Sequence, residues 1–252
     1  MGRLSWLPGR LSWLPVTVLD TRTENPRVRT LVLDVEGWPG HRAGQHVDVR
    51  LTAEDGYSAQ RSYSIASAPG EPSLRLTVER MDDGEVSPYL VDEVRPGDRF
   101  ELRGPIGGHF VWAPGASSPL QLLAGGSGVV PLMAMLRERA GIAAPPPAVL
   151  LLSSRSAEDV IFGDELAGLD ARGDGLRVVQ TLTRSAPAGW EGHRGRFDRT
   201  ALATLGIPAE RRPLTYICGP TAFVESMADL LIGLGHPANR VRTERFGPSA
   251  SG

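Results

Sequence analysis

Four consecutive residues at positions 61–64 combine a permanent cation, a flat aromatic ring and two hydroxyl groups. Side chains alternate along a β-strand, so Arg61 and Tyr63 would share one face and the two serines the other. A guanidinium binds two phosphate oxygens at once, and a phenol ring offers a large stacking surface. The stretch fits a flat, phosphorylated cofactor such as a flavin nucleotide, although an ordinary amphipathic strand would carry the same residues.

A second candidate phosphate site consists of Gly84, Glu85, Val86 and Ser87. The apolar residues that follow predict a short helix that begins near Glu85. A helix N-terminus presents free backbone N–H groups and the positive end of the helix dipole, so it can hold a pyrophosphate. Ser87 would add a hydroxyl, and Gly84 would allow close approach of the backbone. On its own the segment favours a simple turn into a connecting helix, but with Arg61 it becomes the second side of a phosphate clamp.

A glycine-rich turn lies between an apolar run at residues 120–124 and a predicted helix over 132–140. Its residues are Gly125, Gly126, Ser127, Gly128, Val129, Val130 and Pro131. This run, apolar except for Gln121, is typical of a strand covered on both faces in a parallel sheet. A strand, a glycine turn and a helix in this order can bind phosphates, because the turn exposes N–H groups. The turn is not the G-x-G-x-x-G fingerprint, and Pro131 is compatible with the first helical turn.

Three further candidates, Arg155, Arg184 and Cys218, stand at or just after the ends of predicted buried strands. These strands span residues 148–153, 176–182 and 214–218, and helices are predicted over 157–168 and 222–234. Repeated strand–helix units imply a parallel, doubly wound α/β sheet that binds its ligand at the carboxyl ends of the strands. Taken singly, each arginine could equally be an ordinary surface cation, and Cys218 could be a buried thiol of the core.

The first half of the chain shows a different sequence pattern, of short strands and not of alternating strands and helices. Short runs rich in valine, leucine and threonine, bounded by turn residues, predict strands over 16–20, 29–35, 45–51, 61–64, 74–80 and 100–103. Such a series indicates an antiparallel β-barrel or sandwich. His41, His46 and His109 are too scattered for a metal site, and we interpret each as a surface or satisfied barrel histidine.

A length of 252 residues suggests about two domains, which we place at 16–115 for the barrel and 116–252 for the α/β unit. The hydrophobic content of 41% is ordinary for a globular protein. A net charge of −2 does not indicate binding to nucleic acid or to an anionic membrane, which requires an excess of basic residues. The single cysteine excludes an internal disulfide and, within this chain, cysteine-held zinc or iron–sulfur sites.

Residues 1–15 form an N-terminal extension with a duplicated heptapeptide at 2–8 and 9–15. Proline and arginine interrupt its apolar runs, so it is neither a membrane span nor a convincing signal peptide. We interpret it as loosely ordered, with an arm that binds a partner through Trp6 and Trp13 as the alternative. Without an export signal, the protein is expected in the cytoplasm.

From about residue 15 to 248 the chain resembles the ferredoxin–NADP reductase family of flavoproteins. The resemblance rests on RSYS at 61–64, GEVS at 84–87, GGSGVVP at 125–131, CGP at 218–220 and ERFGP at 244–248. Each motif is moderately specific, and all of them occur in the order and spacing of the family. The resemblance implies a flavin-binding barrel followed by a nucleotide-binding α/β domain.

By this resemblance, Tyr63 stacks on the flavin ring, Arg61 binds its phosphate, and Ser64 approaches flavin N5. The segment 84–87 holds the pyrophosphate of FAD, since FMN-using relatives build this loop differently. The nicotinamide nucleotide site is formed by residues 125–128 together with Cys218, Gly219 and Pro220. Cys218 would lie near the carbon that transfers hydride. Glu244 and Phe246 would lie beside the flavin, and Ser64 and Glu244 would tune its protonation.

The implied activity is that of an FAD-dependent NAD(P)H oxidoreductase. Electrons would leave to a separate acceptor such as ferredoxin, a haem protein or another redox subunit, because this chain lacks the fused iron–sulfur domain of many relatives. A free-flavin or ferric-chelate reductase, and a non-catalytic flavin-binding electron-transfer subunit, stay open as alternatives. Arg155 and Arg184 favour NADPH over NADH. An NAD-specific site usually has a carboxylate directly after such a strand to bind the ribose 2′-hydroxyl, whereas a 2′-phosphate calls for arginine. Here the first acids after the strand at 148–153 are already within the predicted helix.

Overall fold

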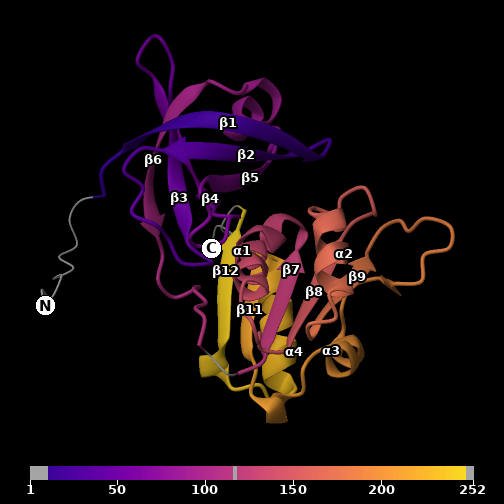
Figure 1. The fold of residues 1–252 in the computed structure, drawn as a ribbon. Coiled ribbons are helices and arrows are strands. Elements are labelled where there is room, and N and C mark those ends of the chain that lie inside the picture. The colour runs from indigo at the N-terminus through magenta and orange to yellow at the C-terminus, as the bar shows by residue number, and fades with distance from the viewer. Residues whose placement is uncertain (1–10, 116–117, 248–252) are drawn as a thin grey trace, which may run out of the picture.

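The computed structural model describes residues 11–115 and 118–247, which form two sheets, one above the other in Figure 1. The first sheet is antiparallel, with strand order β4-β3-β6-β1-β2-β5. Its strands are β1 (Leu14–Asn25), β2 (Val28–Val35), β3 (His46–Thr52), β4 (Ser58–Ser64), β5 (Leu74–Glu79) and β6 (Arg99–Ile106). A bridge between Ile65 and Leu76 joins the two edges, so the sheet curls into the predicted barrel around a buried aliphatic core.

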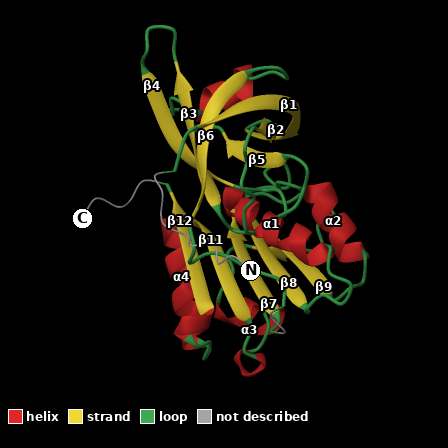
Figure 2. Ribbon diagram, turned by 60° about the vertical axis from the view of Figure 1, so that its left-hand side comes forward, coloured by secondary structure: helices red, strands yellow, loops and turns green. Residues whose placement is uncertain are grey.

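The second sheet is parallel, with strand order β10-β9-β8-β7-β11-β12. Figure 2 shows the order from β9 to β12. Its strands are β7 (Leu120–Gly125), β8 (Ala148–Ser154), β9 (Leu176–Leu182), β10 (His193–Arg194), β11 (Leu214–Pro220) and β12 (Val241–Phe246). Helices α1 (Val129–Ala140) and α2 (Gly163–Ala171) pack into one apolar cluster, and α3 (Arg199–Leu205) and α4 (Thr221–Gly233) into another. Helices on both faces of a parallel sheet confirm the doubly wound fold.

Two helices begin later than the sequence predicted. Helix α2 starts at Gly163 rather than at residue 157, because the Asp159 carboxylate accepts hydrogen bonds from the Ser156 N–H and hydroxyl and closes a turn there. Phe162 then adopts a left-handed conformation, with φ 61°, which also interrupts a helix. The helical turn after the 84–87 segment spans Tyr89–Glu93 instead of opening near Glu85.

The N-terminal strand also begins earlier than expected. Leu14 already pairs with Leu102 in β1, before the predicted domain start at residue 16. The Trp13 ring lies 4.2 Å from the Arg50 guanidinium and 4.9 Å from that of Arg103, both on the barrel. Cations over an indole face are attracted to it, so the second heptapeptide ends docked on the barrel. Trp6 lies outside the described residues, and the predicted domain boundaries stay a proposal.

The two sheets are joined by packing as well as by the chain. Val28, Ala43 and Ala66 from the barrel half belong to the same apolar cluster as α1. Arg137 of α1 donates from Nη1 to the Ala66 carbonyl oxygen at 2.6 Å and binds Glu165 of α2 through Nε and Nη2. In the described part of the chain, no helix is long and apolar enough to cross a membrane.

Candidate functional site

Side chains from both sheets meet where the barrel faces the α/β half. His46 and Ser64 are directly paired across β3 and β4. His46 Nδ1 lies 3.7 Å from Glu244 Oε1, and Glu244 is in register with Cys218 across β12 and β11. The structure therefore brings the predicted catalytic residues Ser64, Cys218 and Glu244 to one junction, with His46 between the two halves.

Glycines keep the loops of the α/β half tightly packed at this junction. A Cβ added at Gly128 would lie 2.1 Å from the Cys218 carbonyl oxygen, and one at Gly219 would lie 3.2 Å from Gly125 Cα. Gly126 has φ +53° and open space beside it. Only glycine permits this contact between the two loops, and the open side leaves room for a ligand backbone. The donor-rich glycine turn thus fits a nucleotide phosphate.

The remaining predicted residues of these two loops lie next to them. Ser127 belongs to the tight helical turn at Gly126–Gly128, and Pro131 is buried in the first turn of α1. Pro220 caps the start of α4. Phe246 ends β12 opposite Pro220 and is 37% exposed. They flank the junction on the side of the α/β sheet.

Burial controls the protonation of the junction. It raises the pKa of Glu244 from 4.5 to about 7, and the Oε2 atom has no hydrogen-bond partner in the described residues. Burial lowers the pKa of His46, so the 3.7 Å contact with Glu244 joins two groups that both favour their neutral forms. Burial, reinforced by Glu244, raises the pKa of the Cys218 thiol. Glu244 is thus poised to hold or release a proton near neutral pH.

The two segments predicted to form a phosphate clamp on the barrel lie next to each other. Arg61 Nη2 lies 3.4 Å from Glu85 Oε2, which joins the 61–64 and 84–87 segments. Gly84 packs against Ser87, since an added Cβ would lie 2.9 Å from the Ser87 hydroxyl oxygen. That hydroxyl accepts a hydrogen bond from the Met81 N–H at 3.0 Å and keeps its own proton for donation. Val86 is fully buried and anchors the loop.

Tyr63 is half-buried at the edge of the barrel core, against which its ring packs. Burial raises the pKa of its phenol, which therefore stays protonated. Its cross-strand partner is Val47, whereas Arg61 pairs with Val49. Both valines are buried in the core, so Tyr63 and Arg61 do share one face, as alternation predicted. A half-buried aromatic ring beside a guanidinium fits a flat phosphorylated group.

Arg155 and Arg184 follow neighbouring strands β8 and β9. The Arg184 N–H donates to the Arg155 carbonyl oxygen at 2.9 Å, so the two residues are adjacent. Neither guanidinium has an ion-pair partner among residues 11–115 and 118–247, and the nearby Ser154 hydroxyl oxygen is buried without a partner. Arg155, Arg184 and Ser154 thus lie close together at the carboxyl edge of the sheet, and their side-chain types are ones that can bind a phosphate.

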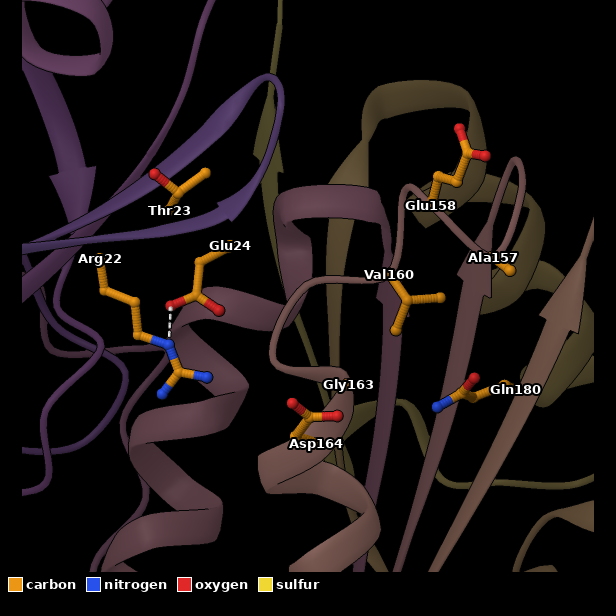
Figure 3. Close-up of a pocket in the computed structure, with 9 residues that line it drawn as sticks. All are labelled: Arg22, Thr23, Glu24, Ala157, Glu158, Val160, Gly163, Asp164 and Gln180. Atoms are coloured by element: carbon orange, nitrogen blue, oxygen red, sulfur yellow. Dashed lines mark ion pairs between the residues drawn. The ribbon is translucent and has the colours of Figure 1, made fainter.

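A cleft of about 500 Å³ lies elsewhere, between the β1–β2 hairpin and the start of α2 (Figure 3). Its lining includes Arg22 and Glu24, an ion pair at 3.8 Å, together with Glu158 and Gln180. None of the predicted site residues lines it. The Glu158 carboxylate belongs to the turn before α2, not to the helix as predicted. Its charged lining residues are three carboxylates, of Glu24, Glu158 and Asp164, and one guanidinium, so the cleft is acidic and does not suit a phosphate.

Two functional candidates were missed from the sequence. From the sequence, His46 was interpreted as a surface histidine or one with its hydrogen bonds made within the barrel, yet it faces Glu244. For His41 the same interpretation agrees with the structure, because its Nε2 is hydrogen-bonded to the Ser67 carbonyl oxygen at 3.0 Å. Tyr57, on the β3–β4 hairpin, donates from its hydroxyl to Glu85 Oε1 at 2.6 Å. Neither residue belongs to a recognisable motif, and each reaches its partner through tertiary packing: His46 across the two sheets and Tyr57 from the β3–β4 hairpin.

Comparisons with known proteins agree with this arrangement. The family model for the oxidoreductase FAD-binding domain matches residues 16–112, and that for the oxidoreductase NAD-binding domain matches 122–229. Ferredoxin–NADP reductase B of Sorangium cellulosum is 37% identical over 213 residues, which cover 81% of this chain and 84% of that protein. The glycine betaine monooxygenase reductase subunit of Pseudomonas aeruginosa is 31% identical, but this chain spans only 57% of its length.

Solved structures give the same result. The FAD/NAD-binding domain of nitric oxide dioxygenase from Vibrio cholerae superposes with a TM-score of 0.83 at 26% identity, over 95% of this chain and 100% of that one. The cytochrome P450 reductase of Amycolatopsis superposes with a TM-score of 0.81 at 27% identity, over 94% of this chain and 71% of that one. With both domains matched in order and a relative aligned over most of its length, the chain belongs to the ferredoxin–NADP reductase family of FAD- and NAD(P)-binding oxidoreductases.

Proposed function

We propose that this oxidoreductase takes reducing equivalents from NADPH and delivers them to a separate redox protein. When bound, FAD supplies the chemistry that side chains lack, which is acceptance of a hydride and release of electrons one at a time. The observation that carries the proposal is the meeting of Ser64, Glu244 and Cys218 where the barrel faces the α/β sheet. A site shared between the two halves can hold a flavin against a nicotinamide, and such positioning supplies most of the rate.

Each half contributes its own ligands in this proposal. Arg61 and the segment 84–87 hold the phosphates of FAD, and Tyr63 packs against its ring. The glycine turn at 125–128 and the run 218–220 hold the nicotinamide nucleotide, with Cys218 shaping the pocket. Glu244 holds a proton at Oε2 near neutral pH, because burial raises its pKa to about 7. Ser64 offers a hydroxyl at the same place.

NADPH is favoured over NADH by Arg155 and Arg184, whose backbones lie next to each other at the ends of β8 and β9. A ribose 2′-phosphate calls for such cations, whereas a 2′-hydroxyl calls for a carboxylate. Among the nearest acids, Asp159 is engaged by Ser156. Replacing Arg155 with alanine should raise the KM for NADPH about tenfold or more, since a charge-assisted hydrogen bond contributes about 1.5–3 kcal/mol. NADH kinetics should hardly change.

Steady-state kcat/KM for both nucleotides tests this preference. The matched control is Arg211→Ala, which removes an exposed arginine just before β11, at the amino edge of the same sheet. It should leave both nucleotides unaffected. Equal kcat/KM for NADPH and NADH in the parent, or equal losses for both in Arg155→Ala, would remove the case for a 2′-phosphate site.

A separate redox protein is proposed as the acceptor on two grounds. This chain has one cysteine, so it cannot itself hold a cysteine-ligated iron–sulfur cluster. Its relatives bear the names of a ferredoxin–NADP reductase and of a monooxygenase reductase subunit. Anaerobic NADPH-driven reduction of a ferredoxin and of cytochrome c should exceed reduction of free FMN or ferric citrate. The reverse order would identify a free-flavin or ferric-chelate reductase.

The proposal includes a location in the cytoplasm, where the sequence predicted the protein. Cell fractionation followed by detection of the full chain tests this. Recovery of the chain mainly in an extracellular or membrane fraction would contradict it.

A further inference from the structure

Glu85 occupies the point at which the phosphate ligands of the barrel converge. Its Oε2 lies 3.4 Å from Arg61 Nη2, and its Oε1 accepts the Tyr57 hydroxyl hydrogen bond at 2.6 Å. Arg61 Nη1 donates to the Gln60 carbonyl oxygen at 2.7 Å. The free donor edge of the Arg61 guanidinium is therefore directed at a carboxylate of this same chain.

A carboxylate is a chemical stand-in for a phosphate at a guanidinium. Both present two anionic oxygens that match its planar fork. Donation to Glu85 raises the pKa of the Tyr57 phenol, so the hydroxyl keeps its proton and continues to hold the carboxylate. The side chains of Arg61 and Glu85 are 54% and 52% exposed, so neither is locked in place by packing. Glu85 can leave this position when another anion arrives.

We propose that the Glu85 carboxylate is an internal competitor for the phosphate-binding guanidinium of Arg61, and that its charge limits how tightly the chain holds FAD. This inference rests on the proposed role of Arg61 and the 84–87 segment in holding the FAD diphosphate. Bound FAD has to displace the carboxylate from Arg61. The displaced carboxylate stays on the same loop, one residue from Gly84, and repels the diphosphate from there.

The test compares the dissociation constant for FAD of the parent chain with that of Glu85→Gln, by quenching of flavin fluorescence. Glutamine keeps the shape of the side chain and removes its charge. Glu85→Gln should bind FAD about three- to tenfold more tightly at low salt, from the strength of partly exposed charge pairs. The gain should shrink as salt rises, because the Debye length falls to about 8 Å at physiological ionic strength.

Asp83→Asn is the matched control. It removes an exposed negative charge from the same loop, at a residue with no ion-pair or hydrogen-bond partner in the described chain. If Glu85 competes specifically for Arg61, Asp83→Asn should change FAD affinity much less than Glu85→Gln. Equal gains in both variants would show a general effect of loop charge and overturn the proposal.

Tyr57→Phe supplies a second, independent measurement. Without the hydroxyl that holds Glu85 near Arg61, the carboxylate is displaced more easily, so FAD should bind slightly more tightly. In the Glu85→Gln background the same substitution should have no effect, because the competing charge is already gone. A double-mutant cycle measures this difference. Unchanged or weaker FAD binding in Glu85→Gln would overturn the competition. Such a failure of the competition leaves the proposed function intact as long as the parent chain binds FAD and oxidises NADPH. A parent chain that does not bind FAD would contradict both the competition and the proposed function.

Discussion

Replacing Glu244 with glutamine isolates the cost of placing a carboxylate at the junction of the two halves. Burial raises its pKa from 4.5 to about 7. At about 1.4 kcal/mol per pKa unit, that shift corresponds to roughly 3 kcal/mol of penalty on the ionised form. The side chain is still 27% exposed, and solvent screening lowers our expectation to about 2 kcal/mol.

The sign of the effect follows from proton binding. Between pH 4.5 and about 7 the folded chain holds the Glu244 proton while the unfolded chain releases it. The contribution of Glu244 to the free energy of unfolding therefore falls as pH rises through this window and is constant above it. Glutamine is neutral throughout. Glu244→Gln should match the parent near pH 4.5 and exceed its stability by about 2 kcal/mol above about pH 8.

Urea unfolding of the FAD-free chain at a series of pH values measures this difference, because bound cofactor would add its own stabilisation. Glu225→Gln is the control, since its carboxylate is 59% exposed on α4. Its stability relative to the parent should show no rise over the same window. A difference for Glu244→Gln that is independent of pH, or a variant less stable than the parent above about pH 8, would mean that the carboxylate is well solvated or paired.

Three further substitutions probe the junction. Tyr63→Ala should weaken FAD retention by roughly 1–3 kcal/mol through lost stacking and burial, as flavin release on dilution would measure; full retention would exclude a stacking role. Cys218→Ser should slow flavin reduction by NADPH in stopped flow with near-normal FAD content, and a parental rate would assign Cys218, which is 2% exposed, to the core alone. Gly128→Ala should lower the melting temperature and abolish nucleotide-dependent reduction, because its Cβ would lie 2.1 Å from the Cys218 carbonyl oxygen; a parental melting curve would contradict this packing.

Local patterns were sufficient to predict most of the framework. The run that became β7 is buried at every position, and the glycine turn that follows it leads directly into helix α1, as predicted. Strand β12 left no such signal, because none of its residues is fully buried. The sequence pattern predicted no strand there, and the ERFGP resemblance singled out only residues from 244 onward, as a segment beside the flavin. The late start of α2 was missed because Phe162 adopts a left-handed conformation that bulky residues rarely take.

The candidate site was predictable motif by motif but not as a constellation. Glu244 and His46 lie far apart in the sequence, and their 3.7 Å contact depends on how the two sheets pack. The pairing of Tyr57 with Glu85 depends on the reach of a hairpin. No periodicity encodes either distance. Motifs and the family resemblance therefore supplied the candidate residues, whereas tertiary packing decided their partners.

The contact of Arg137 with the barrel has a consequence for building chimaeric reductases. Arg137 reaches across from α1 to a backbone carbonyl, that of Ala66, while its side-chain partner Glu165 lies on its own half of the molecule. Any residue type at position 66 supplies the same oxygen. A barrel transplanted from another relative should therefore keep this contact with Arg137 without a matched substitution at position 66, provided that its main chain follows the same path after β4 and that its residues at positions 28 and 43 still pack against α1.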